Sequence, residues 1–182
     1  MQKSAKHVFD EFRREKFGLD GDDRVQAPKQ AYAEDLQNAT QQLSESLNDR
    51  RLHFVFELIQ NAEDNYYECD EPSLHFELLD NDPTGTPQCQ GALLVVNNES
   101  GFTADDFRAL CAIGKTTKSK QIGMIGEKGI GFKSVFAVSP SPHVFSRGFQ
   151  FRFSENPHPD LGFGYIVPYW VSRVPPVVKR AK

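Results

Sequence analysis

Two side chains one helical turn apart give the first indication of chemistry in this sequence. Glu57 and Asn61 lie in the segment ELIQNAEDN, and at helical spacing they point in nearly the same direction. A carboxylate can orient water for attack on a phosphoryl group, and an asparagine oxygen is a hard ligand for Mg²⁺. The segment therefore predicts Glu57 as a general base and Asn61 as a metal ligand. An exposed polar helix face is the alternative interpretation.

A glycine cluster is the most informative motif. The segment GEKGIGFKS places Gly126, Gly129 and Gly131 directly before a predicted helix. Glycines in that position let backbone amides converge on an anion at the positive end of the helix, and Lys128 and Lys133 add charge. The pattern predicts a phosphate-binding loop, with a flexible glycine turn as the alternative.

An amide at a predicted strand end is suited to base recognition. Asn97 stands where VVN runs into the turn NESGF, and it offers an acceptor and a donor to an adenine edge. Gly101 would let the backbone pass close to a flat base. An ordinary asparagine-rich turn is the alternative. Further on, Lys115, Lys118 and Lys120 lie in a loop without hydrophobic periodicity, which predicts either a lid over phosphates or a solvated basic loop.

Two stretches imitate a P-loop without its context. ALCAIGKT (109–116) has alanine for the first glycine, and GEKGIGFKS differs from the motif by one inserted residue. A P-loop follows a buried strand and opens a helix, whereas the first stretch completes a predicted helix. No GxGxxG occurs in the order that a Rossmann turn requires. The sequence therefore favours neither a P-loop nor a Rossmann fold.

Hydrophobic spacing predicts the elements that hold these residues. Helices are expected at about 4–17, 32–47, 51–67, 104–113 and 131–138, and a strand pair at 74–80 and 91–97. Short strands are expected at HVFS, FQFRF and FGYIV, with Arg147-Gly148 as a hairpin turn. The apolar stripe of the third helix is predicted to be Leu52, Val55, Phe56, Ile59 and Ala62. This order favours an α+β fold, a two-layer α/β sandwich with an antiparallel strand pair, over a doubly wound parallel sheet.

Composition narrows the class of protein. The chain has 182 residues, 38% of them hydrophobic, and a formal charge of −4, which argues against a nucleic-acid-coating surface. No apolar run approaches the roughly 20 residues that span a bilayer, and the N-terminus lacks a signal-peptide core, so a cytoplasmic or nuclear location is expected. Three cysteines without CxxC spacing and five histidines without HxxxH pairing favour neither a disulfide framework nor a zinc site.

At these motifs the chain resembles the GHKL ATPases, the group of gyrase B, Hsp90-type chaperones, histidine kinases and MutL, which share the Bergerat fold. ELIQNAEDN resembles their N box, NNESGF their second box and GEKGIGFKS their glycine box, in the family's order. The run from LHFVFELIQNAEDNYY to IGEKGIGFKSVF is most similar to the N-terminal ATPase-like domain of the NO VEIN and sacsin group. The similarity runs from about Leu43 to Phe153.

The resemblance implies a Bergerat-type domain with a mixed, mostly antiparallel sheet that binds ATP and Mg²⁺ and hydrolyses ATP slowly, coupled to lid closure. It assigns water activation to Glu57, the Mg²⁺ contact to Asn61 and adenine recognition to Asn97. The other nucleotide-binding positions that it implies are Gly101, Phe102, Lys115, Gly126, Lys128, Gly129, Ile130, Gly131, Phe132 and Lys133. Residues 114–125 would be the lid. The expected divisions are an N-terminal helix and loop (1–28), the ATPase-like domain (29–170) and a C-terminal tail (171–182).

Two departures from the family pattern keep other functions open. Most GHKL proteins carry aspartate where Asn97 stands, and their domain continues into further strands for which no equivalent follows Trp170. A C-terminally incomplete copy would have an open sheet edge that favours pairing with another chain. The alternatives are therefore a pseudo-ATPase or truncated nucleotide-binding module without turnover, and a protein-interaction remnant. A protein partner or self-association is expected in either case, with neither nucleic acid nor membrane.

Overall fold

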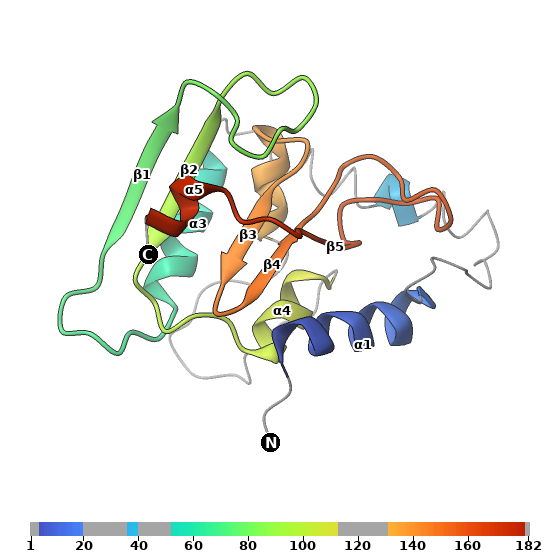
Figure 1. Cartoon of the computed structure of the whole chain (residues 1–182), viewed down its shortest axis with the longest axis horizontal. Coiled ribbons are helices and arrows are strands. Elements are labelled where there is room, and N and C mark those ends of the chain that lie inside the picture. The colour runs from blue at the N-terminus through green and yellow to red at the C-terminus, as the bar shows by residue number, and fades with distance from the viewer. Residues whose placement is uncertain (1–3, 20–35, 40–51, 113–130, 181–182) are drawn as a thin grey trace.

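Two small antiparallel sheets and the helices around them make up the fold (Figure 1). The computed structural model describes residues 4–19, 36–39, 52–112 and 131–180. Its elements are α1 (Ala5–Phe17), α3 (His53–Glu63), β1 (Leu74–Leu79), β2 (Ala92–Asn97), α4 (Ala104–Leu110), the 3-10 helix η1 (Gly131–Ala137), β3 (His143–Ser146), β4 (Phe149–Arg152), β5 (Tyr169–Trp170) and α5 (Pro176–Arg180). The predicted α+β class is confirmed.

Helix α1 has a cap at each end. At its start the side chain of Ser4 accepts from the backbone N–H of His7 at 3.2 Å. At its end Gly18 adopts the left-handed conformation with φ of 68° and donates to the carbonyl of Arg14 at 3.0 Å. The helix predicted over residues 4–17, with Gly18 as its stop, is confirmed.

Strands β1 and β2 form the first sheet, an antiparallel pair that the sequence predicted. Leu74 lies opposite Asn97 and Leu79 lies opposite Ala92. Figure 1 shows this sheet at one side of the molecule, with β1 at the outer edge. The register places Asn97 at the end of β2 that adjoins the loop to α4.

The second sheet, in the order β3-β4-β5, covers an aromatic core. The hairpin turn at Arg147-Gly148 is confirmed, and alternate residues of β4 are buried. On that buried face Phe149 stacks on Phe107 of α4, with ring centroids 5.2 Å apart. From α1, Phe9 meets Trp170 edge-on at 5.1 Å. Helix α1 therefore packs against the core.

Helix α4 begins with a reciprocal capping box. Thr103 accepts from the backbone N–H of Asp106, while the Asp106 carboxylate accepts from the backbone N–H of Thr103 at 3.0 Å. The helix includes Ala109 and ends at Leu110. The stretch ALCAIGKT thus begins inside a helix, which is the context that disfavours a P-loop.

The segment FGYIV was predicted as a strand, and this prediction is wrong. Residues 163–167 are buried but irregular, and the strand that pairs with β4 is β5. Tyr165 has a positive φ of 58°, which interrupts an extended conformation. A Cβ at Gly164 would lie 2.5 Å from the carbonyl oxygen of Asn156, so the chain passes close to its neighbouring backbone there. Within the predicted tail, residues 176–180 form α5.

Some predictions fall outside the described residues. Of the helix expected at 32–47, residues 36–39 are described and are helical. The proposed lid at 114–125 and the first part of the glycine cluster also lie outside. In the described part of the chain, no helix combines the length and the apolar character needed to cross a membrane.

Candidate functional site: helix α3 and the start of η1

The carboxylate of Glu57 lies against the backbone of Gly131. A Cβ built on Gly131 would stand 1.8 Å from Oε2 of Glu57 and 2.6 Å from its Cδ, so the carboxylate occupies the space of any side chain at that position. The other oxygen, Oε1, lies 3.1 Å from Nε2 of His53, one turn earlier on α3. The Glu57 side chain is 21% exposed. The structure therefore brings together a half-buried carboxylate and the last glycine of the predicted phosphate loop.

Helix α3 is rotated relative to the predicted stripe. The structure buries Phe54 and Ala62, and Leu58 packs against the core. Of the predicted stripe, Ala62 is buried, whereas Phe56 is 67% exposed, and Leu52 and Ile59 are also exposed. Two apolar stripes run along this helix, and periodicity alone could not choose between them. Which stripe is buried matters, because the buried stripe determines that the polar face of α3 lies near η1.

Asn61 shares the flank of Glu57. Both side chains have intermediate exposure, and both stand three residues after a residue of the face that packs inward, Phe54 or Leu58. The half-exposed side chain of Asn61 thus lies on the side of the helix that carries the carboxylate. This placement suits the predicted pairing of a general base with a single protein ligand for Mg²⁺.

The serine of the glycine box fixes the first turn of η1. Ser134 is fully buried, and its hydroxyl donates to the carbonyl of Gly131 at 2.6 Å. Val135 and Phe136, which follow it, belong to the aromatic core. Gly131 is therefore held from the core side while Glu57 approaches it from α3.

Lys133 points into the protein. Its Nζ donates to the carbonyl of Leu110 at 2.7 Å and lies 4.2 Å from the centroid of the Phe153 ring. Burial lowers the pKa of Lys133 to about 7, and the positive charge of Lys16 acts in the same direction. Phe132 packs against the same ring with centroids 5.9 Å apart. The side chains of Phe132 and Lys133 therefore both pack against the core, beside the end of α4.

Asn97 is linked to the end of α3 through a tyrosine. The hydroxyl of Tyr67 donates to the carbonyl of Ala62 at 2.8 Å, and the side chain of Asn97 interacts with the same hydroxyl. Burial, together with the charge of Glu99, raises the pKa of Tyr67. Because the tyrosine proton is used on Ala62, the NH2 group of Asn97 is the end of the amide that can donate toward this hydroxyl. The amide carbonyl of Asn97 is then the group that remains to accept from a base.

Gly101 and Phe102 contact the β3–β4 turn. Gly101 has φ of 85°, and a Cβ on it would lie 2.6 Å from Cβ of Arg147. The backbone N–H of Phe102 donates to the hydroxyl of Ser146 at 2.9 Å, and its ring packs against the core. These contacts connect the NNESGF motif to the β3-β4-β5 sheet.

Five further predicted positions lie outside the described residues, so their predicted roles stay predictions. They are Lys115, Gly126, Lys128, Gly129 and Ile130.

His53 and Tyr67 were missed by the sequence reasoning. The signal for His53 was its position four residues before Glu57, which places an imidazole beside the carboxylate on one helix. Tyr67 carried no local signal, because its partners come from the end of α3 and from β2. Its contact with Asn97 depends on the fold.

Comparison with known proteins decides the family. The family model described as the Sacsin domain matches residues 34–158. The chain belongs to the sacsin-domain family. Protein NO VEIN of Arabidopsis thaliana is 44% identical to this sacsin domain over 166 residues, and Sacsin of Homo sapiens is 33% identical over 106 residues. These alignments cover 88% and 55% of the chain but only 6% and 2% of the two relatives, so it spans a small part of their length.

Proposed function

We propose that this sacsin domain binds ATP with Mg²⁺ and hydrolyses it slowly in the manner of the GHKL ATPases, on a Bergerat-type scaffold. The observation that carries the proposal is the contact between the Glu57 carboxylate and Gly131, at a place where no side chain fits. Two predicted motifs that are far apart in the sequence meet there. A structural glycine turn alone would not require a carboxylate at that point.

Glu57 is the proposed group that orients water and takes its proton. His53 holds Oε1, which leaves Oε2 directed at the Gly131 backbone and fixes the carboxylate for one geometry. The side chain of Glu57 keeps partial access to solvent, with 21% of its surface exposed. His53 acts as a positioning residue, because its contact is with Glu57.

Asn61 is the proposed protein ligand for Mg²⁺, whose remaining ligands would be phosphate oxygens and water. When bound, the ion would neutralise charge on the phosphates. Asn61 fits this task because it is half-exposed on the helix flank that carries Glu57. The proposed phosphate contacts of Gly126, Gly129, Lys115 and Lys128 rest on the sequence.

Asn97 is the proposed adenine-recognising residue, with Tyr67 as its positioning residue. The interaction with Tyr67 favours an orientation in which the NH2 group of Asn97 faces the tyrosine hydroxyl and its carbonyl faces the adenine amine. A tyrosine hydroxyl would thus replace the charge of the usual aspartate in setting the orientation. Tyr67→Phe should weaken selectivity for ATP over GTP, whereas retention of selectivity would contradict this role.

Calorimetric titration of the full chain with Mg·ATP, metal-free ATP and Mg·GTP tests the binding step. We expect saturable binding that depends on Mg²⁺ and favours adenine. Asn61→Ala should weaken Mg·ATP by about tenfold or more and metal-free ATP much less. Equal weakening of both would remove Asn61 from the metal site, and a flat titration of folded protein would refute ATP binding.

Turnover is tested with a matched pair of variants on α3. Glu57→Gln should lower the hydrolysis rate by about a hundredfold or more while ATP affinity stays nearly unchanged. Glu63→Gln changes an exposed glutamate at the end of the same helix and should leave the rate as it is. His53→Ala should lower the rate by about tenfold without changing affinity. Equal rates for Glu57→Gln and Glu63→Gln would exclude Glu57 as the base.

A nucleotide-binding or protein-interaction module without turnover is the second candidate. The observation that favours it is Lys133, whose ammonium donates to Leu110 inside the core. Arg147 likewise occupies the space beside Gly101 that the resemblance assigned to the base. Saturable ATP binding with no hydrolysis above that of Glu57→Gln would support this second function.

A further inference from the structure

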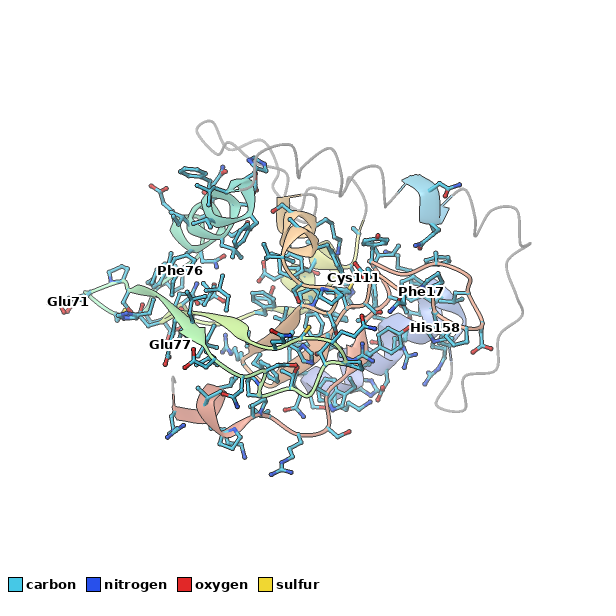
Figure 2. The ribbon with its side chains drawn as sticks, turned by 90° about the horizontal axis from the view of Figure 1, so that it is seen from above. Phe17, Glu71, Phe76, Glu77, Cys111 and His158 are labelled. Atoms are coloured by element: carbon cyan, nitrogen blue, oxygen red, sulfur yellow. The ribbon has the colours of Figure 1, made fainter. Side chains whose placement is uncertain are left out.

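Strand β1 is exposed on both faces and at one edge. His75, Phe76, Glu77 and Leu78 are all exposed, with Leu78 at 83% and Phe76 at 41%. Figure 2 shows Phe76 and Glu77 on opposite sides of the ribbon, Phe76 toward α3 and Glu77 toward α5. In the described part of the chain β2 is the only strand paired with β1. An open edge with apolar side chains is a template for pairing with another strand.

The register identifies the backbone groups at that edge. Asn98 donates its backbone N–H to the carbonyl of Ser73 at 3.4 Å, so this pair continues the ladder as a hydrogen-bonded pair. Hydrogen-bonded pairs alternate along antiparallel strands, which assigns His75, Glu77 and Leu79 to bonds with β2. The N–H and C=O groups of Leu74, Phe76 and Leu78 therefore point away from β2, toward the open edge.

The sequence of β1, LHFELL, is complementary to itself when a second copy runs antiparallel. With the two-fold axis at Phe76, the outward groups of Phe76 pair with Phe76 of the second copy, and those of Leu74 pair with Leu78. His75 then lies opposite Glu77 of the second copy, twice by symmetry. These are non-hydrogen-bonded positions, where side chains approach most closely.

Charge selects this register over its neighbours. An axis at Glu77 would place two glutamates opposite each other, and an axis at His75 would place two histidines opposite each other. The axis at Phe76 alone places the His75 imidazole opposite the Glu77 carboxylate at both symmetric positions and uses the whole strand. Inside the chain, His75 and Glu77 face the apolar residues Val96 and Leu94 across the ladder, so the β1–β2 pairing does not require a polar side chain at either position.

We propose that β1 pairs with β1 of a second copy about this axis, giving a four-stranded antiparallel sheet β2-β1-β1-β2. The occupant of the open edge is thus another molecule of this chain. The contact is one strand wide and smaller than a standard interface, so the association is weak and depends on concentration. It is independent of ATP.

Sedimentation equilibrium of the full chain over a wide concentration range tests the proposal through a charge swap. His75→Glu brings two carboxylates together at each of the two symmetric pairs, and it should weaken dimerisation by about tenfold because both pairs change at once. Glu77→Lys removes the carboxylate that faces the His75 imidazole at both pairs and should also weaken dimerisation. The double variant H75E/E77K places a carboxylate opposite an ammonium group at both symmetric pairs across the axis, and it should restore dimerisation. Both sites are exposed, and circular dichroism checks that every variant stays folded.

Leu78→Pro provides an independent variant, because it removes one outward N–H and keeps the N–H groups that bond to β2. It should also lower the dimer affinity. A wild-type chain that remains monomeric at all concentrations would overturn the proposal, and that result would leave the edge to a strand of a different protein. Dimerisation that the double variant weakens by the product of the two single effects would equally overturn it, since complementarity would then play no part.

Discussion

Replacement of Lys133 by methionine should change how stability depends on pH. Lys133 is buried with its ammonium near the Phe153 ring, and its pKa is lowered from 10.5 to about 7. The folded protein therefore binds fewer protons at this site than the unfolded chain does. Stability must then rise with pH between the two pKa values. The destabilisation that comes from burying the charged Lys133 ammonium is complete below about pH 7 and vanishes above about pH 10.5.

The expected magnitude follows from the proton difference. Between about pH 8 and about pH 10 the unfolded chain holds nearly one more proton at Lys133 than the folded protein, and each pH unit then contributes about 1.4 kcal/mol. The free energy of unfolding of the wild type should therefore rise by about 2–3 kcal/mol relative to Lys133→Met over this interval. Loss of the bond to Leu110 lowers the variant's stability by about 1 kcal/mol at every pH and leaves the slope unaffected.

Urea denaturation at a series of pH values measures this difference in slope. Lys179→Met, which changes an exposed lysine of α5, is the control and should follow the wild-type curve. Parallel curves for the wild type and Lys133→Met would refute the reasoning, because they would mean that Lys133 stays fully protonated in the folded protein. Mg·ATP titration of the same variant then locates the ammonium. Unchanged affinity for Mg·ATP would mean that the Lys133 ammonium stays in the core when ATP binds. A large loss of affinity would mean that it contacts the phosphates.

Three further predictions concern the scaffold, and thermal or urea denaturation checks each. Phe9→Ala should lower the free energy of unfolding by about 3–5 kcal/mol, since Phe9 is fully buried between rings of α4, β4 and β5. Thr103→Ala should cost about 1 kcal/mol through loss of the capping box, and Thr103→Ser should retain most of it. Gly101→Ala should cost about 1–3 kcal/mol because of its positive φ and the close Cβ of Arg147. Arg147→Gly in the same chain should recover part of that loss, and no recovery would contradict the steric argument.

Local signals predicted much of the scaffold. Gly18 ends α1, Thr103 begins α4 and Arg147-Gly148 forms the hairpin, because each depends on the chemistry of one or two neighbouring residues. The β1–β2 pair was also predictable from two strand patterns joined by a turn. These features require no knowledge of what packs against them.

Long-range contacts determine the structural features that could not be predicted from local sequence patterns. Leu58 and Ile59 are equally apolar, and only the packing partner of α3 determined that Leu58 turns inward. The apolar segment FGYIV is buried, as its composition requires, but a positive φ at Tyr165 prevents a strand. Lys133 looked like a phosphate contact because of its neighbours in sequence, whereas its neighbours in space are Leu110 and Phe153.

The candidate site depends on the way η1 joins two parts of the molecule. Ser134 and Phe136 anchor η1 in the aromatic core, whereas α3 contributes Glu57 from the other side. The position of Gly131 is therefore set by the core, and the position of the carboxylate by α3 and His53. A substitution that loosens α3, such as Phe54→Ala, should separate Glu57 from Gly131 and reduce turnover more than it reduces nucleotide binding. A substitution in the aromatic core should instead lower stability, while the molecules that remain folded keep the site intact. A loss of turnover with Phe54→Ala that core substitutions do not cause would therefore show that the α3–η1 contact is catalytic and not merely structural.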